Sequence, residues 1–213
     1  MIEIKSLSKK YGNLPVFENF NLSLTDGTVT ALMGDSGSGK TTLLNVLAGL
    51  TSYSGEIFGL PEKKGYVFQS DRLIPHMTVK QNLMLVSDEQ KVNEFLEKAN
   101  LYEFRNEYPS RLSAGMSRRV AILRAFLFGA PLLLMDEPFT NLDLSLKYKL
   151  MNFFCQLNAE ERKTTLFVTH DVDEAVNMAD RVVVIKRGGE IVYDVVKGEN
   201  TEKELKELFL KNL

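Results

Sequence analysis

Residues 34–41, Gly-Asp-Ser-Gly-Ser-Gly-Lys-Thr, constrain the fold of this chain more than any other segment. They fit the phosphate-binding loop pattern, in which two glycines separated by four residues precede a lysine and a hydroxyl side chain. The apolar residues 29–33 before the loop indicate a buried strand, and residues 40–50 after it indicate a helix that ends near Gly49. This order of strand, glycine-rich loop and helix is the context that the pattern requires, and it predicts an α/β fold.

The residue types of the loop suit the phosphate chain of a nucleotide. Glycines allow backbone N–H groups to surround phosphate oxygens, and the following helix points its positive dipole end at the same anion. Lys40 adds a positive charge for the β- and γ-phosphates, and the Thr41 hydroxyl can bind Mg²⁺. We predict that the loop binds ATP and Mg²⁺ through Gly34, Ser36, Gly37, Ser38, Gly39, Lys40, Thr41 and Thr42.

Apolar strands alternate with helices along most of the chain. Period-2 alternation over 2–24 indicates an antiparallel part, and Asp26-Gly27 after it is typical of a hairpin turn. Beyond the loop, strands are predicted at 55–58, 65–69, 132–135, 164–169, 181–186 and 190–195, and helices at 144–161, 173–179 and 202–213. This alternation predicts a mostly parallel sheet with helices on both faces.

Residues 70–127 differ from the rest, because no strand-like segment is evident in them. Val92, Phe95 and Leu96 follow helical spacing, as do several apolar residues near 120–127. We therefore expect a single domain over 1–213 with a helical subdomain at 70–127 inside it.

Composition excludes several classes of protein. The chain has 213 residues, of which 44% are hydrophobic and 25% charged, and this suits a globular domain with a sizeable core. A net charge of -2 offers no basic surface for nucleic acid. The one cysteine, Cys155, cannot form an intramolecular disulfide and is expected in a helix core. No apolar run is long enough to cross a bilayer.

Two adjacent acids end a second apolar strand. Residues 132–135 are Leu-Leu-Leu-Met, and Asp136 and Glu137 follow them. Because neighbouring strand residues point to opposite sides, we expect the two carboxylates to have different tasks. Asp136 is predicted to hold Mg²⁺, and Glu137 to polarise the water that attacks a phosphate.

Six segments, in this order, resemble the nucleotide-binding subunit of an ABC transporter, and the resemblance covers nearly the whole chain. They are the Walker A segment at 36–42, Gln69 of the Q-loop, the signature at 112–116, the Walker B segment at 132–137, the D-loop at 141–143 and the switch histidine His170. The resemblance implies that His170 contacts the γ-phosphate and that Gln69 senses Mg²⁺ or the attacking water. It also implies that Tyr11 stacks on adenine and that Asp143 contributes to nucleotide binding.

The signature departs from the family's usual LSGGQ at two positions, where Ala114 and Met116 stand. In the family this segment binds the γ-phosphate held by a second subunit, and Ser113 and Gly115 keep that chemistry. If position 114 needed a positive φ, alanine would cost about 1 kcal/mol there. We therefore expect slower hydrolysis rather than none.

The resemblance implies two copies that close around two MgATP, and a separate transmembrane permease subunit. The ATPase would then lie at the cytoplasmic face of the cell membrane, with no nucleic-acid partner. Segments such as 112–124 and 167–180 look most like nitrate-, sulfonate- or taurine-type importers. The alternatives are an exporter or lipoprotein-release ATPase, and a non-hydrolytic switch that dimerises with ATP.

Three smaller signals carry expectations of their own. Arg118 and Arg119 follow the signature and are interpreted as a solvated helix face, with interdomain pairing as the alternative. His76 is expected at the surface, in a region that would contact the membrane partner. Leu205 and Phe209 belong to an apolar stripe expected to pack the last helix on its own domain.

Overall fold

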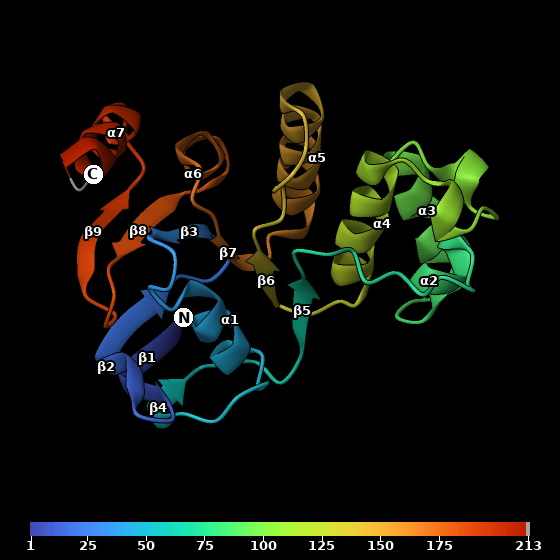
Figure 1. Ribbon diagram of the computed structural model, residues 1–213. Helices are drawn as coiled ribbons and strands as arrows, with labels where there is room; N and C mark the ends of the chain where they lie inside the picture. Colours follow the sequence, from blue (N-terminus) through green and yellow to red (C-terminus); the bar gives the residue numbers. More distant parts are fainter. Residues whose placement is uncertain (212–213) are drawn as a thin grey trace.

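The computed structural model describes residues 1–211, and its strands and helices alternate along most of the chain (Figure 1). The strands are β1 (Ile2–Tyr11), β2 (Leu14–Leu24), β3 (Val29–Gly34), β4 (Ser54–Phe58), β5 (Lys64–Val67), β6 (Leu132–Asp136), β7 (Thr164–Val168), β8 (Arg181–Ile185) and β9 (Ile191–Val196). The helices are α1 (Lys40–Leu47), α2 (Val79–Met84), α3 (Glu89–Lys98), α4 (Ala114–Leu127), α5 (Leu144–Glu161), α6 (Val172–Met178) and α7 (Thr201–Lys211), with short 3-10 turns at Tyr102–Phe104 and Pro109–Arg111. The last two residues of the predicted closing helix, 212 and 213, lie outside the described part.

A six-stranded sheet in the order β5-β6-β7-β3-β8-β9 forms the centre of the molecule. Its first five strands are parallel, and β9 joins the edge antiparallel to β8. The predicted mostly parallel α/β fold is therefore confirmed. Since the carboxyl ends of parallel strands lie at one edge, the segments after β3, β6 and β7 meet there.

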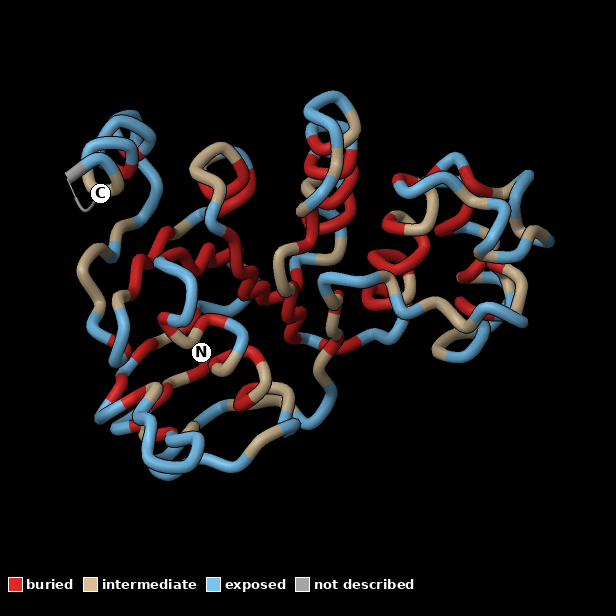
Figure 2. Tube along the Cα trace, viewed as in Figure 1, coloured by how far each residue is buried: buried red, intermediate tan, exposed pale blue. Residues whose placement is uncertain are grey.

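Alternate residues of the central strands enter two separate hydrophobic cores. In β6, Leu132 and Leu134 face α1 and the small sheet, whereas Leu133 and Met135 face the helices of the opposite side. Figure 1 shows α5, α6 and α7 on that opposite side, and Figure 2 shows the central strands buried between the two layers. Burial on both faces explains why β6 is an unbroken apolar run.

The antiparallel part is a three-stranded sheet in the order β2-β1-β4. The predicted hairpin at Asp26-Gly27 is wrong, because β2 pairs with β1 and β3 belongs to the central sheet. The turn instead carries the chain from one sheet to the other, and the Gly27 N–H donates to Thr164 Oγ1 over 2.9 Å. A glycine with φ of 69° suits a turn, but a turn alone does not decide which strand pairs next.

Helices α2, α3 and α4 form a separate group beside β5, and the region holds no strand (Figure 1). Thr78 caps α2 in a reciprocal capping box with Gln81, and Asp88 caps α3. At the other end of the chain, Leu205 is fully buried on the main core and Phe209 packs beside it, as predicted. Among residues 1–211, no helix has the length and apolar character needed to span a bilayer.

Candidate functional site

The glycine-rich loop leads from β3 directly into the N-terminus of α1. Gly39 is the N-cap of α1 with φ of 100°, and no side chain caps the helix there. The first N–H groups of the helix therefore remain directed at the loop. Gly34 has φ of 146°, and an added Cβ would lie 2.0 Å from the carbonyl oxygen of Ile185. The backbone path of the loop thus requires glycine at position 34.

Lys40 is almost buried inside this loop. Its ammonium group donates hydrogen bonds to the carbonyl oxygens of Gly34 and Asp35, both over 2.8 Å. Burial lowers the pKa of Lys40, while the carboxylates of Glu137, Asp35 and Asp136 act in the opposite direction. The loop therefore holds one cation at its centre with three carboxylates around it.

Asp136 at the end of β6 reaches the first turn of α1. Its Oδ1 accepts a hydrogen bond from Thr41 Oγ1 over 3.1 Å. Burial raises the pKa of Asp136 and the neighbouring Glu137 raises it further, while the Thr41 hydrogen bond and Lys40 oppose the shift. Two of the three side chains predicted at the Mg²⁺ site, Thr41 and Asp136, thus lie together, and Gln69 is the third.

Glu137 does not continue the strand, so the predicted alternation of two strand residues does not apply to it. Its φ is 44°, and its N–H donates to the carbonyl of Val168 over 3.0 Å. Glu137 Oε2 accepts from Gln69 Nε2 over 3.4 Å and from Thr140 Oγ1 over 3.1 Å, and Oε1 lies 3.6 Å from His170 Nδ1. The structure therefore brings three predicted residues, Gln69, Glu137 and His170, into contact.

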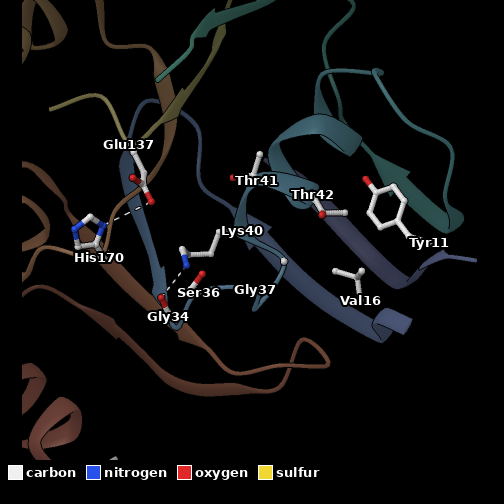
Figure 3. Close-up of a pocket in the computed structure, with 11 residues that line it drawn as sticks. Tyr11, Val16, Gly34, Ser36, Gly37, Lys40, Thr41, Thr42, Glu137 and His170 are labelled. Carbon is white, nitrogen blue, oxygen red and sulfur yellow. Dashed lines mark hydrogen bonds and ion pairs between the residues drawn. The ribbon is translucent and has the colours of Figure 1, made fainter. Parts of the chain in front are cut away.

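A cleft of about 560 Å³ lies over the loop. It is lined by Tyr11, Val16, Gly34, Ser36, Gly37, Gly39, Lys40, Thr41, Thr42, Glu137 and His170. Figure 3 shows Tyr11 and Val16 on one side of Thr42, with Glu137 and His170 at the opposite end of the cleft. Tyr11 is 50% exposed at the edge of the cleft, and the Lys9 ammonium lies 4.8 Å from the centroid of its ring.

One polar atom of the loop has no protein partner among the described residues. The hydroxyl of Ser38 is buried, and no hydrogen bond reaches it. Buried polar groups are usually satisfied, so an orphaned hydroxyl in a glycine-rich loop marks a place for a ligand acceptor. Together with the free N–H groups of α1, it fits the phosphate chain that the sequence predicts.

Four predicted nucleotide-binding residues do not line this cleft: Ser38, which is buried in the loop, and Ser113, Gly115 and Asp143. Ser113 caps α4 and accepts from Met116 N over 3.3 Å, and Asp143 caps α5 and accepts from Leu146 N over 3.0 Å. Gly115 is buried where α4 meets α5, since a Cβ there would lie 2.4 Å from Leu146 Cδ1. The signature therefore packs on the helix that the D-loop begins.

Ala114 does not have the positive φ that the sequence analysis considered for this position. It is the first residue of α4 and is not among the described residues with positive φ. Alanine is a favourable residue in a helix, so this departure from LSGGQ carries no conformational cost.

Arg118 and Cys155 differ from their predictions. Arg118 is only 5% exposed rather than solvated, and it donates to the backbone carbonyls of Phe68 and Gln69. Cys155 is half-buried beside a second cleft rather than fully within the core. His76 is exposed, as expected. Sequence reasoning also missed Val16 and Thr140, because neither residue type signals chemistry by itself.

The comparison with known families decides the identity of this fold and cleft. The model of the family described as ABC transporter matches residues 17–140, which is more than half of the chain. The chain belongs to the ABC transporter family. The resemblance in motif order that the sequence suggested is therefore confirmed at the level of the family.

Curated relatives of this ABC chain include two import proteins. The sulfate/thiosulfate import ATP-binding protein CysA of Photorhabdus laumondii is 39% identical over 88% of this chain and 58% of its own length. The aliphatic sulfonates import ATP-binding protein SsuB 2 of Pseudomonas syringae pv. tomato is 36% identical over 100% of this chain and 94% of its own length. The ABC chain thus spans little more than half of the first protein and nearly all of the second.

Solved structures agree with this assignment. The dimeric structure of MJ0796, a bacterial ABC transporter cassette, has a TM-score of 0.78 and 32% identity, over 93% of this chain and 100% of that one. A post-hydrolysis state of the same cassette, bound to ADP and Pi, also gives a TM-score of 0.78, at 31% identity. This chain is therefore an ATP-binding ABC ATPase domain.

Proposed function

We propose that this ABC ATPase domain hydrolyses MgATP between two copies of itself and thereby powers import through a separate membrane subunit. The observation that carries the proposal is the contact of Glu137 with Gln69 and His170 at the end of a cleft whose floor is the phosphate loop. Both relatives described above are import ATP-binding proteins, which supports import as the direction of transport.

Within one copy, the loop binds the phosphates and Tyr11 stacks on the adenine. Lys40 gives up part of its contact with the backbone carbonyls and pairs with the phosphate oxygens, and Ser38 satisfies its buried hydroxyl on the same anion. Glu137 accepts a proton from the attacking water, and His170 and Gln69 hold the carboxylate and the γ-phosphate in line. Most of the rate enhancement then comes from positioning and from stabilised charge.

Mg²⁺ fits the oxygen donors beside the loop. Thr41 and Asp136 would hold it, with Gln69 as a further ligand, and hydroxyl, carboxylate and amide oxygens are the donors that Mg²⁺ prefers. When bound, Mg²⁺ neutralises negative charge on the β- and γ-phosphates. Burial and the adjacent Glu137 raise the pKa of Asp136, and a bound cation would offset both effects on the carboxylate.

The second half of each site comes from the other copy. Ser113 and Asp143 are exposed outside the cleft of their own chain, and Ser113 is the N-cap of α4, whose first N–H groups have no intrahelical partner. We assign Ser113 and Gly115 to the γ-phosphate held by the partner copy, and Asp143 to the same interface. The dimeric state of the related cassette supports this arrangement.

The membrane subunit contacts the helical region at 70–127, which we treat as a subdomain. Pro75 and His76 of the 73–77 segment are exposed, and a hollow of about 400 Å³ there is lined by His76, Met77, Gln81, Met84 and Leu85. This region would seat a segment of the permease, and the ATPase would then lie at the cytoplasmic face of the membrane.

Two alternatives receive less support. An exporter or lipoprotein-release ATPase would use the same cleft, but the relatives named above are import proteins. A switch that binds ATP without hydrolysis drew its support from Ala114 and Met116. Ala114 adopts an unstrained helical backbone, so that support is weakened.

The Glu137→Gln variant tests the proposal. Loss of a general base costs about 10² to 10⁴ in rate, so the variant should bind ATP and hydrolyse it very slowly. Light scattering should then show a monomer that becomes a dimer only with MgATP. Glu97→Gln, on an exposed face of α3, is the matched control and should keep the native rate. Near-native hydrolysis by Glu137→Gln would refute its role, and a monomer with bound ATP would contradict the composite site.

A further inference from the structure

Arg118 is a buried arginine that the proposed mechanism does not use. It lies in the second turn of α4, the helix that Ser113 of the signature caps, and only 5% of the residue is exposed. Burial lowers the pKa of Arg118, while the nearby carboxylate of Asp71 opposes this. A buried guanidinium is costly unless its hydrogen bonds are satisfied, so its partners matter.

All three partners of Arg118 belong to the segment that carries Gln69. Nη1 donates to the carbonyl oxygen of Phe68 over 2.7 Å, and Nη2 donates to the carbonyl oxygen of Gln69 itself. Nε lies 3.2 Å from Oδ1 of Asp71. The planar guanidinium thus contacts Phe68, Gln69 and Asp71 with three different nitrogen atoms, which a single point charge could not do.

The side chain of Gln69 extends from this held backbone toward the acidic end of the cleft. Its Nε2 lies 3.4 Å from Oε2 of Glu137. This contact is long, so a small shift of the Gln69 backbone would remove it. Arg118 is the side chain that holds the Gln69 carbonyl in place, and it does so from the signature helix.

A second arginine of α4 reinforces the segment farther along. Arg124 Nη2 donates to the carbonyl oxygens of Asp71 and Arg72, over 3.1 and 3.0 Å. Arg72 has φ of 47°, so the chain turns sharply there and its carbonyls face α4. Arg124 holds the turn, whereas Arg118 holds the residue that reaches Glu137.

We propose that Arg118 is a positioning residue for hydrolysis, which fixes the backbone of Gln69 to the signature helix so that the Gln69 amide meets Glu137. This inference rests on the proposed role of Gln69. The inference adds a direct link between the signature and Gln69. The N-terminus of α4 carries Ser113 and Gly115, and a rotation of this helix would move the Gln69 carbonyl with it. Phosphate contact at the signature and alignment at Glu137 are then coupled through one side chain.

A double-mutant cycle of Arg118→Gln and Gln69→Ala tests this link on the full chain. We expect Arg118→Gln to lower kcat by about tenfold, since small displacements near the reacting atoms are costly, with KM for ATP changed less than about twofold. In the Gln69→Ala background the same substitution should change kcat by less than about twofold, because residues that act through one another are not additive. Arg118→Lys, which retains one charged donor, should recover part of kcat.

Arg119→Gln is the matched control. Arg119 is the adjacent arginine, and it donates to the carbonyl of Ala99 within the helical group rather than to the Gln69 segment. It should change kcat by less than about twofold in both backgrounds. If Arg118→Gln does not fold, as judged by thermal unfolding, Asp71→Asn replaces it in the cycle, because it keeps the Arg118 side chain and removes the negative charge that faces Arg118 and Arg124.

Each outcome of the double-mutant cycle tests a different part of the proposal. Equal losses of kcat with and without Gln69, or native kcat in Arg118→Gln, would overturn the positioning role while leaving the ATPase mechanism intact. Native kcat in Gln69→Ala would refute the role assigned to Gln69, and the inference with it. A loss of kcat in Arg118→Gln that occurs only when Gln69 is present would establish the link between Arg118 and Gln69.

Discussion

The Thr41 hydroxyl donates a hydrogen bond to Asp136 Oδ1 over 3.1 Å, although the two residues are separated by 95 positions. The bond joins the first turn of α1 to the end of β6, and so connects the phosphate loop with the acidic strand end. Asp136→Asn should keep this bond, because an amide oxygen also accepts it, but should lose the negative charge. The variant therefore separates the fold of the site from its affinity for a cation.

We expect Asp136→Asn to bind ATP in the absence of Mg²⁺ as well as the native chain does. Addition of Mg²⁺ should then strengthen ATP binding less than in the native chain, and hydrolysis should fall by about 10²-fold or more, since the stabilisation of phosphate charge is impaired. Calorimetric titration with and without Mg²⁺ measures this directly, and the chain has no tryptophan to report it by fluorescence. An unchanged Mg²⁺ effect would remove Asp136 from the proposed Mg²⁺ ligands.

The phosphate loop allows a test of the backbone rather than of charge. In Gly34→Ala the added methyl would lie 2.0 Å from the Ile185 carbonyl, at a φ of 146° that alanine rarely adopts. We expect a loss of about 3 kcal/mol in the free energy of unfolding from overpacking and strain, together with weaker ATP binding. Urea unfolding followed by circular dichroism measures the first effect.

Gly198→Ala is the control for this substitution. No atom lies within 4 Å of its added Cβ, and its φ is outside the left-handed region. Its free energy of unfolding should change by no more than about 1 kcal/mol, which is the range of a compatible glycine-to-alanine change. If Gly34→Ala were as stable as this control, the packing of β3 against β8 at Gly34 would be looser than the structure shows.

The phosphate loop and its flanking elements were predictable because neighbours in the sequence determine them. A glycine-rich turn between an apolar strand and a helix needs no distant partner to be recognised. The same holds for the alternation that indicated the parallel sheet. The sequence predicted that Asp136 and Glu137 follow a buried strand, but it did not predict the backbone of Glu137. The strand ends at Asp136, and Glu137 has a φ of 44°.

Errors arose where distant contacts determine the outcome. Arg118 follows the signature as one of two adjacent arginines, and its burial depends on carbonyls of Phe68 and Gln69 about 50 positions away. The Asp26-Gly27 turn was found, but its strands join different sheets. Local propensity marks where a chain turns, whereas pairing depends on which strand buries the next apolar face.

The signature departures lead to a prediction about rate. Ala114 has an ordinary helical backbone, and Met116 packs partly against the main core. Ala114→Gly with Met116→Gln should therefore change the ATPase rate by less than about threefold, as expected for substitutions that remove no strain and no buried charge. Steady-state phosphate release measures this. A tenfold rise would show that these two residues slow hydrolysis in the native chain.

A buried ion pair beside His170 leads to the last prediction. Lys147 of α5 is 8% exposed and pairs with Asp171 and, over 3.2 Å, with Glu174. Glu174 Oε2 in turn accepts from Thr169 Oγ1 over 2.6 Å. The group therefore ties both neighbours of His170 to the helix that Asp143 begins. Lys147→Met should cost about 3 kcal/mol at neutral pH, since it leaves two carboxylates without their cation.

The pH dependence of this loss follows from the two carboxyl groups. Burial acts to raise the pKa of Asp171, but Lys147 and backbone N–H groups outweigh burial and hold this pKa below its usual value of 3.8. Burial raises the pKa of Glu174, although Thr169 and Lys147 oppose this shift. A depressed pKa contributes stability above the unfolded value that is lost as pH falls through the folded one. Because removal of Lys147 raises the pKa of both carboxyls, the difference between native and Lys147→Met should be largest near pH 7, shrink as the pH falls through these raised values, and be smallest at about pH 3.

Urea unfolding of both proteins from pH 7 to pH 3 checks this prediction. Lys206→Met is the control, because its partner Glu202 lies on the exposed side of α7 and the pair is solvated. That variant should unfold like the native chain at every pH. A Lys147→Met difference that stayed constant across the range would mean that packing of the lysine stem, rather than its charge, stabilises the segment around His170.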